Sequence, residues 1–357
     1  MKSKIISLIM VCITIATVYY ALLYFNNFRN FIISQTQQQL LDTAKATVKG
    51  MEEYIKGYSD SLKVIAQNPS FQKKVYKKFK QDKKKKGGYY RLRDFHRVHE
   101  NNITMVSALD SDGSVLHCYP TDNELIGKSY RNDPGVNYVL KMRRAYVSEA
   151  FTRNNQICLY ILEPVFFRKE FAGIVRCTIP VDALFNRFIP AVIKGGQRNV
   201  WIFDNKKNII IAHNKKNNIG KSVEDIIQCK ASGDGLKNNK KIKENKKSEA
   251  ALKTDVNVTK GIKAIFEKKY QYLPKIKDND EGYGIFMNHQ MHKARIMAFK
   301  RFEAGRRNWK LIISNDYSEK IQPIEKFARN IFVPVLLLLL FFMNRLSSFL
   351  KERMGIY

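Results

Sequence analysis

Two short segments of the chain carry the sequence Ile-Gly-Lys-Ser, which matches the end of a phosphate-binding loop. They run from Ile126 to Ser129 and from Ile219 to Ser222. A complete loop also needs a glycine about five positions before the one that precedes the lysine, so that backbone N–H groups can surround the phosphates. Asp122 and Lys215 stand there instead. The segments therefore argue against nucleotide binding and need another explanation.

Other residue patterns that could support chemistry are incomplete. The run from Asp110 to Gly113 could open a calcium loop, but such a loop needs an acidic ligand near its twelfth position, which is Thr121. A hairpin turn is the better interpretation. His289 and His292 have helical spacing, but no third metal ligand is evident. We predict no metal, no cofactor, no catalytic residues and no enzyme activity.

The repeated segments belong to a longer repeated unit. Asp204 follows Asp110 by 94 residues, and Gly220 follows Gly127 by 93 residues. In each copy an apolar run, an Asp-led turn and a second apolar run precede the Ile-Gly-Lys-Ser segment, and in each copy we expect a helix after it. Two copies of one module are therefore predicted.

Further strands complete each module. The first copy continues with strands at 145–151, 156–167 and 171–180 and a helix to 189, and a hairpin centred near Lys169 would place Cys158 opposite Pro180. We predict no disulfide. The second copy contains a polar insertion at 229–281 and resumes at 282–289, 293–303 and 308–316. Each module is predicted to hold about five antiparallel strands with helices on one side.

The two ends of the chain predict membrane spans. The segment from Ile5 to Phe25 has 21 residues without a formal charge, which at about 1.5 Å per residue crosses a hydrocarbon core of about 30 Å. The segment from Ile331 to Met343 is also apolar, and basic residues flank it. The flanking charges favour cytoplasmic termini, with roughly 300 residues outside the cell (inner) membrane.

A heptad pattern follows the first apolar segment. Two sets of residues spaced seven apart form an a/d seam over four heptads: Leu41, Val48, Ile55 and Leu62, and Ala44, Met51, Tyr58 and Ile65. Two interpretations stay open: a stalk helix that forms a homodimer, or a helix that lies along its own domain. Asn68-Pro69 should end the helix, because proline disfavours the α conformation in the residue before it.

The net charge of +31 raises the question of an anionic partner. Lysines concentrate in Lys73–Lys86 and Lys237–Lys247, and such runs can bind nucleic acid or anionic membrane. Neither run interleaves aromatic residues as a single-strand binding groove does. We therefore interpret them as solvated loops and expect no nucleic-acid partner. A basic module that binds anionic polymer or lipid without signalling is the alternative function.

In this order, these elements resemble the double Cache sensor domains of bacterial chemoreceptors and sensor kinases. The resemblance rests on Gly127–Phe151, Leu162–Leu184 and Ala298–Asp316, and it covers about Phe28 to Phe327. It implies an α+β fold: a long stalk helix followed by two PAS-like modules, each an antiparallel sheet with flanking helices, between two transmembrane helices. It also implies ligand binding in the membrane-distal module.

The resemblance divides the chain into six parts. They are a transmembrane helix (1–26), a stalk helix (27–70), a distal module (71–190), a proximal module (191–327) with its insertion (229–281), a second transmembrane helix (328–350) and a cytoplasmic tail (351–357). The predicted function is ligand sensing outside the cytoplasm for signalling across the membrane. The short tail predicts a separate cytoplasmic signalling protein, or a sensor half of a truncated chemoreceptor or histidine kinase.

Amino-acid-binding members of this family use an Arg-x-Trp-Tyr cluster, a tyrosine and an aspartate. Here Asp133, Gly135 and Val136 stand in place of the cluster, Phe151 in place of the tyrosine and Thr178 in place of the aspartate. The resemblance thus implies a small-molecule ligand and disfavours an amino acid. The predicted ligand-binding residues are Arg131, Asp133, Tyr146, Phe151, Tyr160 and Thr178.

Overall fold

The computed structural model describes most of the chain outside the insertion. The described residues are 2–78, 89–153, 156–194, 198–222, 276, 279–288, 293–302 and 309–353. The lysine-rich run Lys237–Lys247 and the pair His289 and His292 lie outside them, as does almost all of the insertion.

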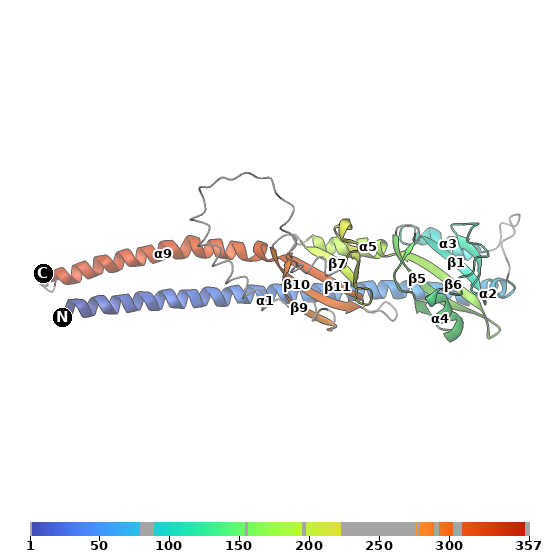
Figure 1. Cartoon of the computed structure of the whole chain (residues 1–357), viewed down its shortest axis with the longest axis horizontal. Coiled ribbons are helices and arrows are strands. Elements are labelled where there is room, and N and C mark those ends of the chain that lie inside the picture. The colour runs from blue at the N-terminus through green and yellow to red at the C-terminus, as the bar shows by residue number, and fades with distance from the viewer. Residues whose placement is uncertain are drawn as a thin grey trace, which may run out of the picture.

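A single helix, α1 (Lys2–Gln67), runs along almost the whole molecule (Figure 1). It includes both the apolar segment and the predicted stalk without a break. Asn68 stops it as expected and begins α2 (Pro69–Tyr76), because its side chain accepts a hydrogen bond from the N–H of Phe71 at 3.2 Å. A short helix, α3 (Tyr90–His99), precedes the first sheet.

The first module is a sheet in the order β2-β1-β6-β5-β3, with β4 also paired to β5. Its helix α4 (Pro134–Met142) follows the first Ile-Gly-Lys-Ser segment, as predicted. The predicted strand 145–151 is instead two short strands, because Ser148 between them exchanges backbone and side-chain hydrogen bonds with Tyr160 at 2.6 Å. The strands are β1 (Met105–Asp110), β2 (Val115–Tyr119), β3 (Tyr146–Val147), β4 (Phe151–Arg153), β5 (Gln156–Phe167) and β6 (Glu170–Pro180). The β5–β6 hairpin pairs Cys158 with Pro180, as the sequence indicated.

The second module repeats this arrangement after the linking helix α5 (Val181–Ile193). Its sheet has the order β8-β7-β11-β10-β9, which is the order of the first sheet with corresponding strands. The strands are β7 (Asn199–Asp204), β8 (Ile209–His213), β9 (Glu281–Asn288), β10 (Lys293–Phe302) and β11 (Trp309–Asp316). The last helix, α9 (Tyr317–Arg353), leaves from the end of β11.

The repeated Ile-Gly-Lys-Ser segments perform the same structural task in both modules. The N–H of Gly127 donates to the carbonyl of Val115 at 2.8 Å, and the N–H of Gly220 donates to that of Ile210 at 2.8 Å. Both glycines have a positive φ, +86° and +84°, which favours glycine. The segments are therefore turns that pair with the outer strand of each sheet. They are repeated because each module needs one such turn.

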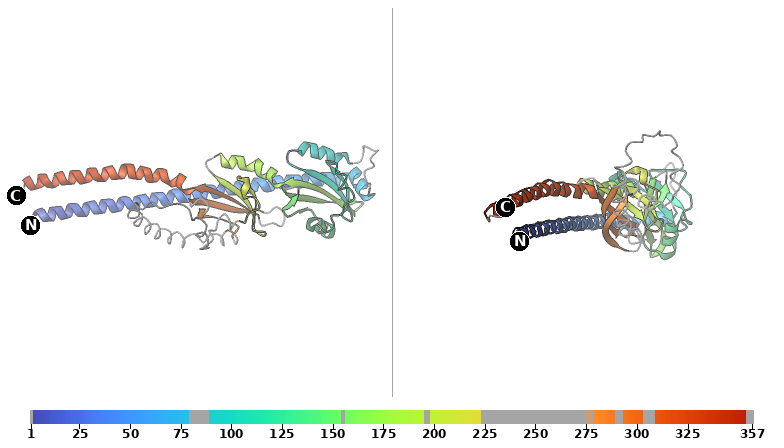
Figure 2. Two further views of the ribbon diagram at one scale, coloured as in Figure 1. Left: turned by 45° about the horizontal axis from the view of Figure 1, so that its top comes forward. Right: turned by 60° about the vertical axis from the view of Figure 1, so that its left-hand side comes forward.

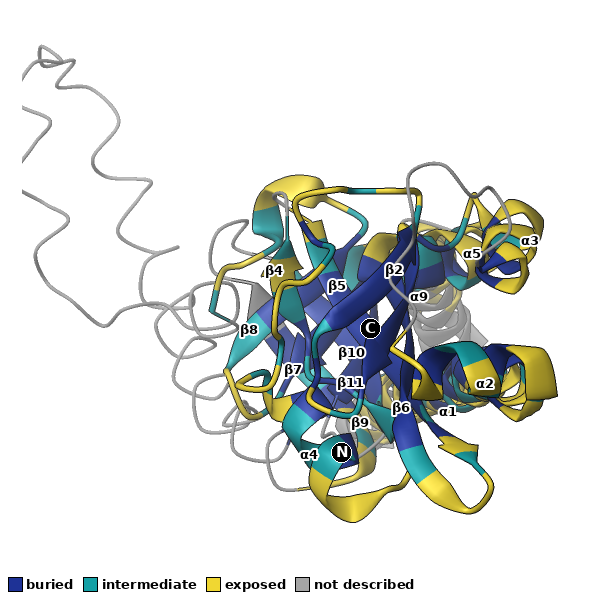
Figure 3. Cartoon of the chain, turned by 90° about the vertical axis from the view of Figure 1, so that its right-hand side faces the viewer, coloured by how far each residue is buried: buried dark blue, intermediate teal, exposed yellow. Residues whose placement is uncertain are grey.

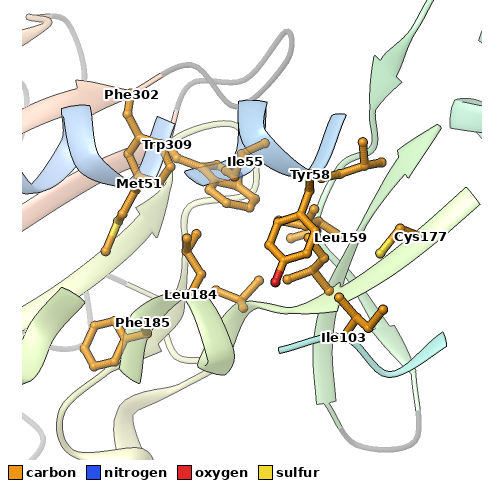
Figure 4. Close-up of a cluster of buried hydrophobic side chains, with 14 of the residues drawn as sticks. Met51, Ile55, Tyr58, Ile103, Leu159, Cys177, Leu184, Phe185, Phe302 and Trp309 are labelled. Atoms are coloured by element: carbon orange, nitrogen blue, oxygen red, sulfur yellow. The ribbon is translucent and has the colours of Figure 1, made fainter. Parts of the chain in front are cut away.

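The heptad seam of α1 packs inside the molecule. All eight seam residues are at most 7% exposed. Figure 4 shows Met51, Ile55 and Tyr58 among side chains from both modules, including Leu184 and Trp309. Of the two interpretations left open, the helix that lies along its own domain is the one that the structure shows, and the seam is not free to form a homodimer because it is buried against the sheets.

Helices cover both faces of the distal sheet. One face packs against α1, α2 and α3, whereas α4 covers the other with Val136 and Val139. Seen from the distal end, the strands are mostly buried and the exposed residues lie on the surrounding helices and loops (Figure 3). The prediction of helices on only one side is thus wrong for this module, and the α4 face becomes an enclosed layer of its own.

The two ends of the chain lie close together, at the end of the molecule opposite the distal module (Figure 2). In the described parts of α1 and α9, no segment combines the length and the apolar character needed to cross a membrane.

Candidate functional site

The α4 face of the distal sheet carries a group of buried polar side chains. Side chains alternate between the two faces of a strand, and Ile174 of β6 belongs to the apolar cluster beneath α4. Arg176 and Thr178 follow it at two-residue steps and so lie on the same face. Ser107 of β1 is paired with Arg176 in the register of the two strands.

Arg176 is the most unusual residue of this group. Its side chain is fully buried, at 0% exposure. Its Nε donates to the hydroxyl of Ser107 at 3.0 Å, and the guanidinium carbon lies 4.2 Å from the ring centroid of Tyr130 and 4.7 Å from that of Tyr160. Its other two nitrogens, Nη1 and Nη2, are buried and have no hydrogen-bond partner among the described residues. A buried cation without such partners is costly, so this arrangement indicates a missing partner.

Thr178 and Tyr160 extend the site along the sheet. They are paired across β5 and β6, and the Thr178 hydroxyl is also buried without a partner in the described part of the chain. The ring of Phe151 lies 4.1 Å from that of Tyr160. Burial raises the pKa of Tyr160, while the nearby Arg176 acts to lower it and Asp133 acts to raise it. The site thus combines opposite charges around one tyrosine.

Asp133 is held in place at the start of α4. Its carboxylate oxygen Oδ1 accepts hydrogen bonds from the N–H groups of Gly135 at 2.9 Å and Val136 at 3.1 Å. This is an N-cap, for which aspartate and asparagine are among the preferred residues. Both bonds go to the same oxygen, and Oδ2 has no hydrogen-bond partner among the residues that the structure describes.

Of the other predicted residues, Arg131 lies apart from this group, and Tyr146 lies at its edge, packed against the same cluster as Tyr160. Arg131 is exposed, and its charge acts on Asp112 of the β1–β2 turn, whose pKa is lowered by Lys78 first and by Arg131 to a smaller extent. Tyr146 is half-buried on the edge strand β3 and packs on the ring of Tyr138 at 4.6 Å. The structure brings Asp133, Phe151, Tyr160 and Thr178 together, with Tyr146 packed at the edge of the same cluster.

A hollow of about 400 Å³ opens at the end of the sheet next to these residues. Arg153 lines it, and its guanidinium nitrogens contact the sulfur of Met105 at 3.7 Å. Met105 is in turn paired with Thr178. The hollow therefore lies beside the buried group, although Arg176, Tyr160 and Thr178 do not line it. Its lining residues are Thr104, Met105, Pro120, Thr121, Asp122, Asn123, Arg153, Gln156 and Cys158.

Arg176 is not among the residues predicted from the sequence, which placed the positive charge of the site on Arg131. One signal could have found it. From Phe171 to Pro180 the strand β6 contains a single charged residue, Arg176, in an otherwise mostly apolar run. A lone arginine in the middle of a buried strand needs a specific partner, because charged residues are almost never fully buried unless they are paired.

The proximal module replaces three of these polar residues with apolar ones and keeps Ser314 in the place of Thr178. Asp110 is paired with Gly173, and its counterpart Asp204 is paired with Trp309. Counting three residues along each strand makes Ile312 the counterpart of Arg176. In the same register Trp201 and Met297 take the places of Ser107 and Tyr160. All three replacements belong to one buried apolar cluster.

This architecture agrees with a family model that describes a double Cache domain and matches residues 26–324. The chain belongs to the Cache domain family. Among curated protein sequences, none matches it.

Solved structures of similar fold include double Cache ligand-binding domains. The domain of the Pseudomonas aeruginosa chemoreceptor PctB in complex with L-Arg is 14% identical, with a TM-score of 0.50, and the match covers 83% of this chain and 93% of PctB. The PctC domain from the same organism, in complex with GABA, is 12% identical, with a TM-score of 0.51 and coverage of 79% and 100%. An extracellular ligand-binding receptor from Desulfohalobium retbaense is 12% identical, with a TM-score of 0.52, and this Cache chain covers 40% of its length.

These complexes correct the prediction about the ligand. The missing Arg-x-Trp-Tyr cluster disfavoured amino acids, yet neighbours of the same fold are in complex with L-Arg and with GABA. The prediction was wrong because it treated one set of positions as the only way to supply charge. In the structure, Arg176 supplies a buried cation from β6 and Asp133 an acid from α4.

Proposed function

We propose that this Cache chain is the extracytoplasmic sensing part of a membrane protein and binds a small molecule in its distal module. One observation carries the proposal. The distal module buries Arg176 and the hydroxyl of Thr178 without hydrogen-bond partners for Nη1, Nη2 and Oγ1 in the described residues. A bound molecule that supplies those partners would remove the cost of burying them.

The neighbouring geometry supports the same position. The hollow beside Met105 offers a way in, and the aromatic rings of Tyr130, Tyr160 and Phe151 offer flat apolar surfaces beside the cation. Small-molecule sites typically combine apolar walls with a few polar groups that fix orientation. Binding rather than catalysis is the proposed role, in agreement with neighbours described as ligand-binding domains.

Membrane anchoring is the second part of the proposal. The 21-residue uncharged segment Ile5–Phe25 and the apolar segment Ile331–Met343 lie on α1 and α9, which extend side by side from the proximal module (Figure 1). Large apolar side chains on both helices are exposed: Ile13, Ile15, Leu22, Val335, Leu337 and Phe341. Such surfaces need an apolar surrounding, which a lipid bilayer provides.

A ligand screen tests the binding part. The full chain, purified in detergent, is heated with each member of a panel of amino acids, carboxylates, sugars and nucleosides. A ligand at 100 times its Kd stabilises the native state by about 2.7 kcal/mol. A panel in which no class of small molecule raises the unfolding midpoint would contradict the proposal.

Protease protection tests the anchoring part. Protease added to intact spheroplasts should cleave the surface loops of both modules and spare tags placed at the two termini. Cleavage of a terminal tag, or protection of both modules, would contradict the proposed topology.

A further inference from the structure

We infer that Arg176 is the residue that binds the ligand's carboxylate, and that the ligand enters in the plane of its guanidinium between Tyr130 and Tyr160. The inference rests on the proposed function and deepens it, because it names the chemical class that the distal site accepts. The proposed carboxylate-binding residue, Arg176, lies on β6, and the exposed Arg131 takes no part in binding the ligand.

The surroundings of Arg176 leave one direction free. The two tyrosine rings lie 4.2 and 4.7 Å from the guanidinium carbon and contribute cation–π contacts. The Nε group is occupied by Ser107 at 3.0 Å. Only the edge formed by Nη1 and Nη2 lacks hydrogen-bond partners among the described residues. A partner must therefore approach that edge.

This edge favours a carboxylate over other anions. Two guanidinium N–H groups side by side match the two oxygens of a carboxylate, which gives paired charge-assisted hydrogen bonds. A planar carboxylate can lie in the guanidinium plane beside the two flanking rings, whereas a tetrahedral phosphate projects oxygens out of that plane. The Thr178 hydroxyl, buried two residues farther along β6, is a further polar contact on the same face.

The carboxylate could belong to a simple organic acid or to an amino acid, and Asp133 distinguishes these two sources. Its Oδ1 is engaged by the helix, and its Oδ2 has no partner in the described part of the chain. A Cβ at Gly135 would lie 3.2 Å from Asp133 Oδ1 and 3.4 Å from the Cβ of Ser148, whose hydroxyl accepts a hydrogen bond from the N–H of Tyr160, so Asp133 lies close to this part of the site. An ammonium on the ligand would face Asp133, whereas a simple acid would gain nothing from that charge.

The test uses the full chain in detergent and a panel of common L-amino acids, each with its amide and its des-amino acid. Binding is measured by thermal shift and titration calorimetry. We expect hits that carry a carboxylate and no binding of the matching amides. Arg176→Met should weaken binding about 100-fold or more, because one partner of a buried charge pair is removed. Arg131→Met is the matched control and should leave affinity unchanged.

Two further variants sharpen the result. Asp133→Asn keeps the N-cap and removes the charge, so it should weaken binding of an amino acid but not of its des-amino acid. In the absence of ligand, Arg176→Met should raise the unfolding midpoint, since it removes a buried charge that lacks partners. A lower midpoint together with unchanged affinity would show that Arg176 is structural and overturn the inference.

The inference and the proposed function can fail separately. Equal binding of an acid and its amide, or a hit that Arg176→Met binds as well as the wild type does, would overturn the inference and leave a distal ligand site standing. Binding of sugars or nucleosides alone in the wider screen would likewise overturn the inference about a carboxylate and leave a ligand site standing. If no class of small molecule binds, both are wrong.

Discussion

The same face of the two sheets carries different side chains in the two modules. In the distal module it carries Ser107, Tyr160 and Arg176, and the arginine has two nitrogens without hydrogen-bond partners within the described residues. In the proximal module the corresponding positions are Trp201, Met297 and Ile312, which pack together. At these three positions the distal module therefore keeps polar side chains or a tyrosine where the proximal module packs apolar ones.

A second buried arginine shows that the difference is not a matter of charge alone. Arg295 in the proximal module is 5% exposed, but its Nε and Nη2 donate to the hydroxyl and carbonyl of Ser314, both at 3.2 Å. Asp316 and Glu319 also act to raise its pKa against the effect of burial. The protein itself supplies the partners of Arg295, whereas Arg176 is the buried cation for which we propose a ligand as the partner.

Replacing an apolar residue of the proximal sheet by its distal counterpart gives the largest expected effect on stability. Ile312→Arg would place an arginine in the apolar cluster of the proximal module, where Trp201 and Met297 offer it no acceptor. We expect a loss of roughly 4 kcal/mol or more in the free energy of unfolding. Ile312→Val is the control and should cost about 1 kcal/mol. Denaturant titration measures both, and a tolerated arginine would show that this face is not a filled core.

The modules share a buried histidine, and this predicts a common response to acid. Burial lowers the pKa of His117 and of His213 to about 4. The unfolded chain binds protons at higher pH than the folded one. The contribution of each neutral histidine to the free energy of unfolding is therefore fully present above about pH 6.5 and is lost as pH falls towards 4. Each histidine should account for about 3 kcal/mol between pH 7 and pH 4, from about 2.5 pKa units at 1.36 kcal/mol each.

Single replacements separate the two contributions. His117→Phe keeps an aromatic ring on Tyr89, on which His117 stacks at 5.0 Å, and should flatten the pH dependence of the unfolding midpoint. His213→Phe should do the same but also lose the hydrogen bond that Nδ1 accepts from Lys215 N at 2.7 Å. If the unfolding midpoint of both variants depended on pH as that of the wild type does, the two histidines would not be the source of the acid response.

Gly173 marks another difference between the sheets, because its counterpart is Trp309. A Cβ at Gly173 would lie 2.1 Å from the backbone oxygen of Leu109, so Gly173→Ala should force the paired strands apart and cost about 2 kcal/mol. Gly57→Ala on α1 meets nothing within 4 Å and should stabilise the helix by about 0.5 to 1 kcal/mol. Equal unfolding midpoints for Gly173→Ala and Gly57→Ala would show that a Cβ at Gly173 does not force the strands apart.

The smallest expected effect on stability concerns the link between the modules. Lys207 of the proximal module donates to the carbonyl of Ala150, and Lys206 pairs with Glu149 at 3.2 Å, next to Phe151 of the site. Lys207→Met should cost about 1 kcal/mol or less. Both tryptophans of the chain lie in the proximal module, so their emission reports that module.

We expect ligand to change the tryptophan emission of the wild type and of the control Lys216→Met. The change should be smaller in Lys207→Met, while affinity stays within a few-fold. An identical emission change in all three proteins would show that this contact does not carry the response between modules.

Local features of the fold could be predicted from sequence. The break at Asn68-Pro69, the Asp110 and Asp204 turns and the pairing of Cys158 with Pro180 each depend on a few neighbouring residues. Turn and capping preferences and hairpin counting are sufficient for such features.

Features that depend on packing between distant segments could not be predicted in this way. A heptad seam has the same sequence pattern whether it packs against a second chain or against the chain's own sheets. The burial of Val48 and Ile55 against the two modules could therefore not be predicted from the residues around them. The position of α4 on the opposite sheet face and the exposure of Arg131 likewise follow from tertiary contacts. The sequence shows Arg176 as a lone charge in an apolar strand, but only the assembled structure shows that its Nη1 and Nη2 lack partners among the described residues.

Hydrogen exchange with and without ligand tests the central comparison most directly. The full chain in detergent is labelled with and without the L-amino acid that gives the largest thermal shift, and peptides from both modules are compared. We expect slower exchange in β5, β6 and the segment leading into α4, with β7 and β11 unchanged or changed only slightly. Protection centred on Trp201 and Ile312, with none around Arg176, would place the ligand in the proximal module and contradict the account.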